Sequence, residues 1–115
     1  MELDVNGLNL AISASVLPED EMRRLGFTDH KADTWYHCFP VGEGVTLNVA
    51  VPKDGSRLRL DVLDEEFLQP YDYQRILKNN PNLEFAQRVK AQTEFYLELL
   101  SEAGVITGFT RGMYI

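Results

Sequence analysis

Four carboxylates gather where a strand-like stretch of the sequence ends: Asp61, Asp64, Glu65 and Glu66. Carboxylates grouped in this way can hold a divalent cation or act as general acid and base. One functional hypothesis is therefore a metal-dependent hydrolase or nuclease that uses Asp61, Asp64 and Glu65. A structural alternative weighs against it, because Arg59 shares the outward face of the strand with Asp61 and can pair with it. Asp64 also stands where a turn or helix cap belongs.

The two histidines and the single cysteine do not form a pattern typical of a metal site. Zinc needs three or four ligands at short, repeated spacings, which His30, His37 and Cys38 do not supply. Adjacent strand residues point to opposite faces, so His37 and Cys38 cannot act as a nucleophile pair. We expect His37 to share a face with Trp35 and Phe39, Cys38 to be a small buried hydrophobe, and His30 to lie in a solvated loop. No catalytic residue, metal site or cofactor is predicted.

The segment 67–74 gathers two tyrosines, two glutamines and an aspartate around a predicted helix start. Tyrosine is favoured at protein interfaces, so Gln69, Tyr71, Asp72 and Tyr73 form a candidate interaction surface. The structural alternative, which the sequence favours, places Asp72 at the third helical position (N3), where it complements the helix dipole. In that alternative Tyr73 faces the core.

The elements that must position these residues differ between the two halves of the chain. In the first half, apolar residues at every second position predict strands over 8–16, 34–39, 44–51 and 57–63. The sequence Pro52-Lys53-Asp54-Gly55 predicts a hairpin turn, in which Gly55 takes a positive φ. A short helix is predicted over 18–25, with acids in its first turn and arginines in its last.

The second half has helical periodicity. We predict one helix from Pro70 to about Lys78 and a long one over 81–103, with Gly104 as its C-terminal cap. The long helix carries an apolar stripe of Ala86, Val89, Thr93, Tyr96, Leu100 and Ala103. The tail over 105–115 is expected as an edge strand or packed on the sheet.

Phe95 and Leu97 lie off this stripe, so the second half of the long helix is apolar around much of its circumference. A helix that is apolar all round is usually buried on more than one side. Phe95 and Leu97 are therefore a candidate homodimer contact.

Strands followed by helices favour an α+β domain over a doubly wound parallel sheet. We expect a single domain over 1–115, with an antiparallel sheet of three to five strands and the C-terminal helices packed on one face. The length of 115 residues suits one domain. The apolar content of 44% is too high for a disordered chain.

The formal net charge of −7 disfavours direct binding to nucleic acid phosphates and docking on an anionic membrane. Solubility is the ordinary explanation for such a charge, and an acidic surface that meets a basic partner is the alternative. The lone cysteine, the absence of a signal-peptide pattern and the lack of an apolar run of about 18–20 residues make the cytoplasm the expected location.

Three stretches carry a resemblance to known sequences: TWYHC, LRLDVLDEEFLQPYDYQRILKNNP and the ending LLSEAGVITGFTRGMYI. They resemble a group of small uncharacterised proteins found in prophages and mobile elements of Gram-positive bacteria, and the similarity spans nearly the whole chain. The resemblance implies no activity, cofactor or catalytic residue. It implies an accessory role, such as binding a host or element-encoded protein.

Three functional hypotheses follow. The leading one is a small non-enzymatic accessory or protein-interaction protein with an unidentified protein partner. The alternatives are the metal-dependent hydrolase or nuclease and an acidic inhibitor of a DNA-binding protein. The inhibitor would need its acids arrayed in two rows on one exposed face.

Overall fold

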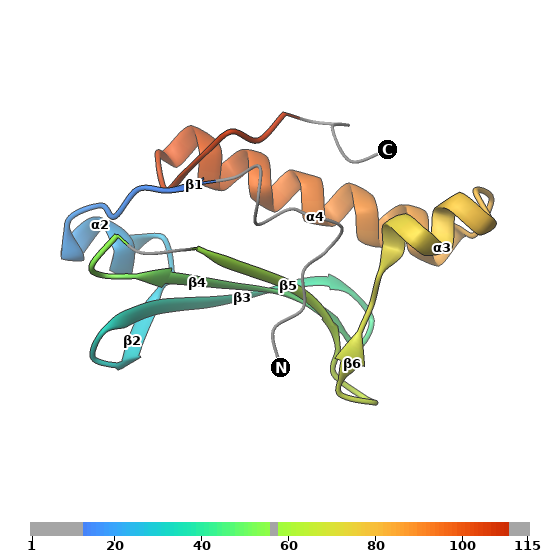
Figure 1. Cartoon of the computed structure of the whole chain (residues 1–115), viewed down its shortest axis with the longest axis horizontal. Helices are drawn as coiled ribbons and strands as arrows, with labels where there is room; N and C mark the ends of the chain where they lie inside the picture. Colours follow the sequence, from blue (N-terminus) through green and yellow to red (C-terminus); the bar gives the residue numbers. More distant parts are fainter. Residues whose placement is uncertain (1–12, 56–57, 111–115) are drawn as a thin grey trace.

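The computed structural model describes residues 13–55 and 58–110. Its centre is a five-stranded antiparallel sheet with the strand order β2-β3-β4-β5-β6 (Figure 1). The strands are β2 (Thr28–Lys31), β3 (Thr34–Gly42), β4 (Val45–Pro52), β5 (Arg59–Asp64) and β6 (Gln69–Pro70). Each strand pairs with the next one along the chain, so the sheet is a simple meander. The α+β class and the antiparallel sheet are confirmed.

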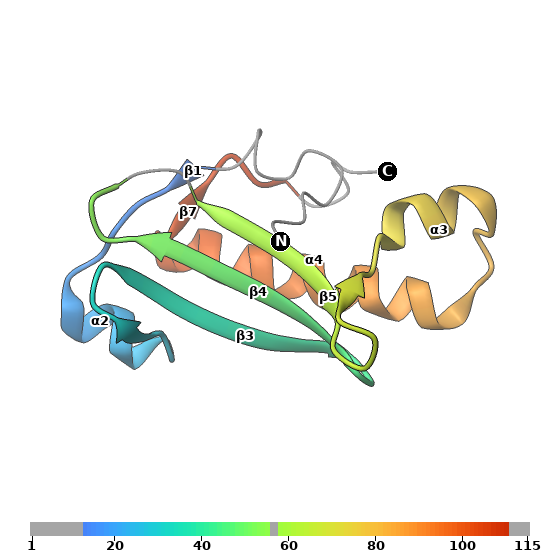
Figure 2. The same cartoon turned by 60° about the horizontal axis from the view of Figure 1, so that its bottom comes forward.

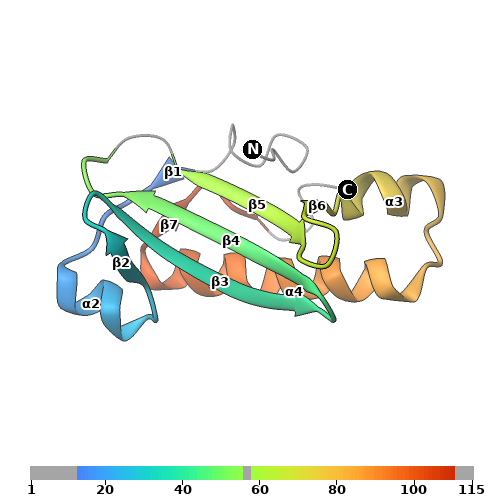
Figure 3. The same cartoon turned by 90° about the horizontal axis from the view of Figure 1, so that it is seen from below.

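The long helix lies along one face of this sheet. The helices are α2 (Glu19–Arg24), α3 (Tyr73–Asn79) and α4 (Glu84–Ala103), and a short ribbon pairs β1 (Ser13–Ala14) with β7 (Ile106–Thr107). Figure 1 shows α4 above the sheet and α3 beyond its end. Seen from below, the strands lie in front of α4, and no helix of the described residues covers this second face (Figure 3). Within residues 13–55 and 58–110, the sheet therefore has one face that α4 covers and one face that no helix covers, which we call the uncovered face.

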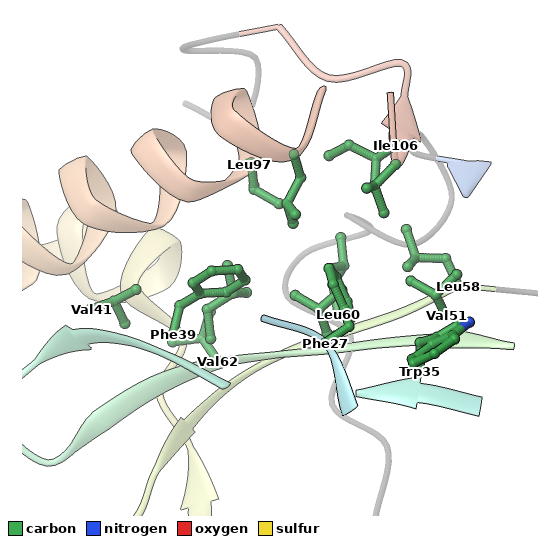
Figure 4. Close-up of a cluster of buried hydrophobic side chains, with 14 of the residues drawn as sticks. Phe27, Trp35, Phe39, Val41, Val51, Leu58, Leu60, Val62, Leu97 and Ile106 are labelled. Carbon is green, nitrogen blue, oxygen red and sulfur yellow. The ribbon is translucent and has the colours of Figure 1, made fainter. Parts of the chain in front are cut away.

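The core forms where alternate strand residues meet in rows that face α4. Phe39, Leu47 and Val62 form one such row across three neighbouring strands. Figure 4 shows Phe39 and Val62 on the sheet, with Leu97 of α4 on the opposite side of the cluster. All four side chains are buried. Since burial of apolar side chains is the main favourable term in folding, this layer contact holds the fold together.

Trp35 is held at the edge of the core by two cations. The guanidinium of Arg23 in α2 lies 5.0 Å from the Trp35 ring centroid, and Lys53 Nζ lies 4.6 Å from it. Both cations also form salt bridges with the carboxylate of Asp29 in β2. The nitrogen–oxygen distance is 3.0 Å for Arg23 and 2.9 Å for Lys53. The hydrogen bond from Lys53, together with that from Arg23, holds the pKa of Asp29 below its ordinary value. This network joins α2, β2 and the turn after β4.

Both C-terminal helices begin three residues later than the sequence predicts. Pro70 belongs to β6, because Gln69 and Pro70 pair with Asp64 and Leu63. The helix α3 therefore begins at Tyr73. The long helix begins at Glu84, and 81–82 form a turn before it.

The C-terminal cap of α4 is as predicted. Gly104 has the left-handed conformation, with a φ of 86°, and the N–H of Val105 donates to the carbonyl of Leu100 at 3.0 Å. The tail then forms β7 as an edge strand on β1, away from the main sheet.

Two strands of the structure, β2 and β1, differ from what the sequence predicts. The strand β2 was not predicted, because its sequence Thr-Asp-His-Lys has no apolar alternation, and His30 lies in this strand and not in a loop. The predicted strand 8–16 falls mostly outside the described residues. Its part at Ser13–Ala14 pairs with β7 and not with the main sheet. The hairpin of β4 and β5 is confirmed, and Gly55 has a φ of 79°.

Candidate functional site

His37 is a packed side chain, as predicted. Its ring stacks on Phe39 with centroids 3.9 Å apart and meets the edge of Phe27 at 5.3 Å. Burial lowers the pKa of His37, and hydrogen bonds to the backbone of Cys38 and Leu25 oppose this effect. The surroundings are those of a structural histidine between a strand and the residues that follow α2.

Cys38 is exposed, so the prediction of a buried cysteine was wrong. It points to the uncovered face of the sheet, since its neighbour His37 faces the core. Its thiol donates to Asn48 Oδ1 on the adjacent strand. Burial, and then the charge of Glu65, raises the pKa of the Cys38 thiol. A raised pKa disfavours the thiolate, which is the nucleophilic form.

The carboxylates proposed for metal or acid–base chemistry have separate roles. Asp64 Oδ1 accepts the backbone N–H groups of Glu66 at 3.0 Å and Phe67 at 3.3 Å, which confirms it as a turn cap. Glu65 accepts the hydroxyl of Thr46 at 2.6 Å. Asp61 lies on the uncovered face. Within residues 13–55 and 58–110, no group of three or more His, Cys, Asp or Glu could hold a metal ion.

The predicted interaction surface forms the junction between β6 and α3. Tyr73 is 1% exposed and faces the core, as the structural alternative predicted. Asp72 is the N-cap of α3 and accepts the N–H of Arg75 at 3.1 Å, so its predicted N3 position was wrong. The Tyr71 ring meets the edge of Phe85, with centroids 5.7 Å apart. Of the four predicted residues, only Gln69 is exposed.

Two exposed apolar residues come directly before this junction. Phe67 and Leu68 lie in the turn between β5 and β6 and are 67% and 74% exposed. We call this pair the hairpin tip. Figure 2 shows the turn at the end of the sheet where the β3–β4 turn also lies. The sequence marks the segment 67–74, but it does not indicate the exposure of Phe67 and Leu68, because alternation does not show which turn residues are uncovered.

Leu68 also has an unfavourable backbone. Its φ is 50°, and it is the one non-glycine residue with a positive φ in the described part of the chain. The left-handed conformation costs an L-residue roughly 1–2 kcal/mol, whereas glycine adopts it without a steric penalty. A glycine or asparagine would suit this turn better and expose less apolar surface. The fold therefore gains nothing visible from a leucine at this position.

Three acidic residues border the hairpin tip. Glu43 lies in the β3–β4 turn, and Glu65 and Glu66 lie in the β5–β6 turn. The N–H of Glu65 donates to the carbonyl of Gly44 at 2.8 Å, which holds the two turns together. All three glutamates are exposed, and none of them belongs to an ion pair within the described residues. We call Glu43, Glu65 and Glu66 the acidic rim.

The candidate dimer contact is divided between the core and the surface. Leu97 is fully buried within one chain, so its predicted role as a contact with a second copy was wrong. The buried stripe of α4 passes through Leu97, which lies four residues after Thr93 and three before Leu100. Phe95 is 49% exposed, and Leu99, one turn further on, is also exposed.

Together these features define a two-layer α+β protein, in which an antiparallel meander carries a long helix on one face. A crystal structure of a DUF1831 family protein from Lactobacillus plantarum has a similar fold, with a TM-score of 0.62 and 13% sequence identity. The similarity covers 83% of this chain and 82% of that chain. No protein-family model and no curated protein matches the sequence. No helix among the described residues is long and apolar enough to span a membrane.

Proposed function

We propose that this chain is a small accessory protein without enzymatic activity of its own, which acts by binding another protein through the hairpin tip. The observation that carries this proposal is Leu68, an exposed leucine at a left-handed turn position that glycine or asparagine would fill with less strain. Backbone strain of this kind concentrates at functional sites. Burial of apolar side chains is the dominant favourable term in most protein–protein association.

The hydrolase alternative has little support. It requires Asp61, Asp64 and Glu65 to converge on a cation, but Asp64 caps a turn and Glu65 accepts a hydrogen bond from Thr46. Asp61 lies on the uncovered face of the sheet, in register with Asn48. The three carboxylates therefore lack a common centre.

The second alternative, an acidic inhibitor of a DNA-binding protein, would imitate the DNA backbone and requires two rows of acids on one face. The described acids lie on both sides of the sheet, with Asp61 on the uncovered face and Glu98 and Glu102 on α4. Others lie at opposite ends, on α2 and in the acidic rim. This distribution favours a local contact over an imitation of the DNA backbone.

An accessory role also agrees with the sequence resemblance to small proteins of prophages and mobile elements. In this proposal the partner is a host or element-encoded protein, and the encounter takes place in the cytoplasm. Phe95 marks a second exposed apolar position, at which a second copy of the chain could bind.

Photo-crosslinking tests the proposal. Phe67 is replaced by p-benzoylphenylalanine in cells that produce the protein, and the cells are irradiated. The expected result is a discrete protein adduct that disappears when Leu68→Ser is added. The same photoreactive residue at Phe95, an exposed aromatic position on α4, is the matched control and should not give this adduct. A folded Phe67 derivative that yields no adduct, or the same adducts as the Phe95 derivative, would contradict the proposal. An adduct at Phe95 with twice the mass of the chain would instead identify a homodimer.

A further inference from the structure

The hairpin tip combines apolar surface with charge of one sign. Phe67 and Leu68 are both more than half exposed, and they follow Glu65 and Glu66 directly in the chain. Glu43 joins them from the neighbouring turn, which the bond from Glu65 to Gly44 holds in place. A surface that meets the tip must therefore accept two apolar side chains next to turns that carry three acidic residues.

Charge complementarity selects among the surfaces that could cover the tip. Burying an unpaired carboxylate is costly, so a neutral or acidic surface would oppose close contact. An anionic membrane would repel the acidic rim in the same way, and the net charge of −7 adds to that repulsion. Cationic side chains on the facing surface would form ion pairs with the acidic rim instead.

We propose that the partner binds the hairpin tip in an apolar pocket whose border carries lysine or arginine side chains. This inference rests on the proposed function and specifies the partner's chemistry. Phe67 and Leu68 fill the pocket and supply the binding energy, because the removal of apolar surface from water favours association. The acidic rim steers the encounter and fixes its orientation, which makes binding sensitive to salt.

The acidic rim can be altered without disturbing the fold. Glu65 is left unchanged, because it accepts the hydroxyl of Thr46. Glu43 and Glu66 are exposed, and their side chains have no hydrogen bond or ion pair within the described residues, so the variant is Glu43→Gln with Glu66→Gln. The matched control is Asp20→Asn with Glu21→Gln, which removes the same charge from exposed positions on α2.

The test measures the yield and the location of the Phe67 photo-adduct. We expect the crosslinked peptide of the partner to be apolar and flanked by lysine or arginine in its folded surface. Removing the two rim charges should lower the yield about fivefold, and the control pair should leave it unchanged. Raising the salt from about 50 to about 500 mM NaCl in extracts should lower the yield in the same direction, since the Debye length falls severalfold.

The outcomes separate the two proposals. A protein adduct that is insensitive to salt and to the rim variant, or that maps to a neutral or acidic surface, would overturn this inference and leave the proposed function standing. An adduct whose peptides come from a second copy of this chain would also overturn it. Crosslinks to lipid alone, or no adduct, would remove the proposed function itself.

Discussion

Leu68 lowers the stability of the fold in two ways. Its apolar side chain is exposed to water, and its backbone has the left-handed conformation. Single exposed apolar residues are common on protein surfaces and need no explanation. A strained, exposed leucine next to an exposed phenylalanine is less common, because selection for stability alone would replace it. The residue therefore connects the structure to the proposed binding role.

At position 68 glycine should give a more stable protein than alanine, which is the reverse of the usual order. Leu68→Gly should be about 0.5–1 kcal/mol more stable than Leu68→Ala, because alanine keeps the left-handed strain that glycine relieves. At an ordinary exposed position the order is reversed, and glycine is the less stable of the two. Urea unfolding of both variants measures the difference. Alanine equal to or better than glycine would show that the backbone at Leu68 is unstrained.

The Asp29 network predicts a pH-dependent contribution to stability. The pKa of Asp29 is lower in the folded chain than in the unfolded one, where it is about 3.9. Its stabilising effect is therefore present above that value and is lost as the pH falls through the folded pKa. Asp29→Asn should lower the urea midpoint at neutral pH, and the difference should vanish in acid. Fluorescence of Trp35, the one tryptophan, follows unfolding, and Asp20→Asn is the control. An equal deficit at both pH values would contradict this.

Single residues were predictable from the sequence where local alternation decides their environment. The core position of Tyr73 and the shared face of His37 and Phe39 follow from spacing alone. The exposure of the hairpin tip does not, because alternation does not show which turn residues are uncovered. The exposure of Cys38 does not either, because it depends on which sheet face α4 covers. Local spacing carries no information about that choice.

At the scale of elements, α3 depends on its first residues. Asp72 accepts the N–H of Arg75 and satisfies one of the donors that a helix start leaves open. Asp72→Ala should cost about 1 kcal/mol, whereas Asp72→Asn should stay close to the wild-type value, because asparagine caps as well as aspartate. Thermal or urea unfolding compares the two. If both variants lose the same stability, the aspartate acts through its charge on the helix dipole and not as a cap.

Two residues of α4 that are close in the chain differ in their environment: Phe95 is exposed and Leu97 is buried. Leu97→Ala should cost about 2–5 kcal/mol, as expected for a fully buried leucine, whereas Phe95→Ala should cost less than about 1 kcal/mol. The cost at Leu97 should be independent of protein concentration, because the contact of Leu97 lies within one chain. A cost at Leu97 that grows on dilution would instead indicate an interface between copies.

The strongest elements could be predicted from the sequence, and the weak ones could not. The hairpin of β4 and β5 and the end of α4 at Gly104 have both periodicity and turn residues to mark them. The strand β2 and the start of α3 are marked by neither, because they depend on pairing with the neighbouring strands β3 and β5. Phe95 and Leu97 could not be told apart from the sequence either. Where a helix is apolar around much of its circumference, periodicity does not show which side is buried.

At the scale of the whole molecule, the fold separates stability from recognition. The core lies between α4 and one face of the sheet, and the hairpin tip with its acidic rim lies at the end of that sheet (Figures 2 and 4). A change at the tip should therefore alter binding without affecting the core. The similar fold of the DUF1831 family protein supports the architecture and leaves the function to be argued from the site.

A competition experiment tests this separation most directly. Excess wild-type protein should suppress the photo-adduct formed through position 67. The double variant Phe67→Ser with Leu68→Gly should unfold at the same or a higher urea concentration than the wild type and yet fail to suppress the adduct. A double variant that competes as well as the wild type, or that has lost its folded structure, would contradict the claim that the hairpin tip serves binding and not the fold.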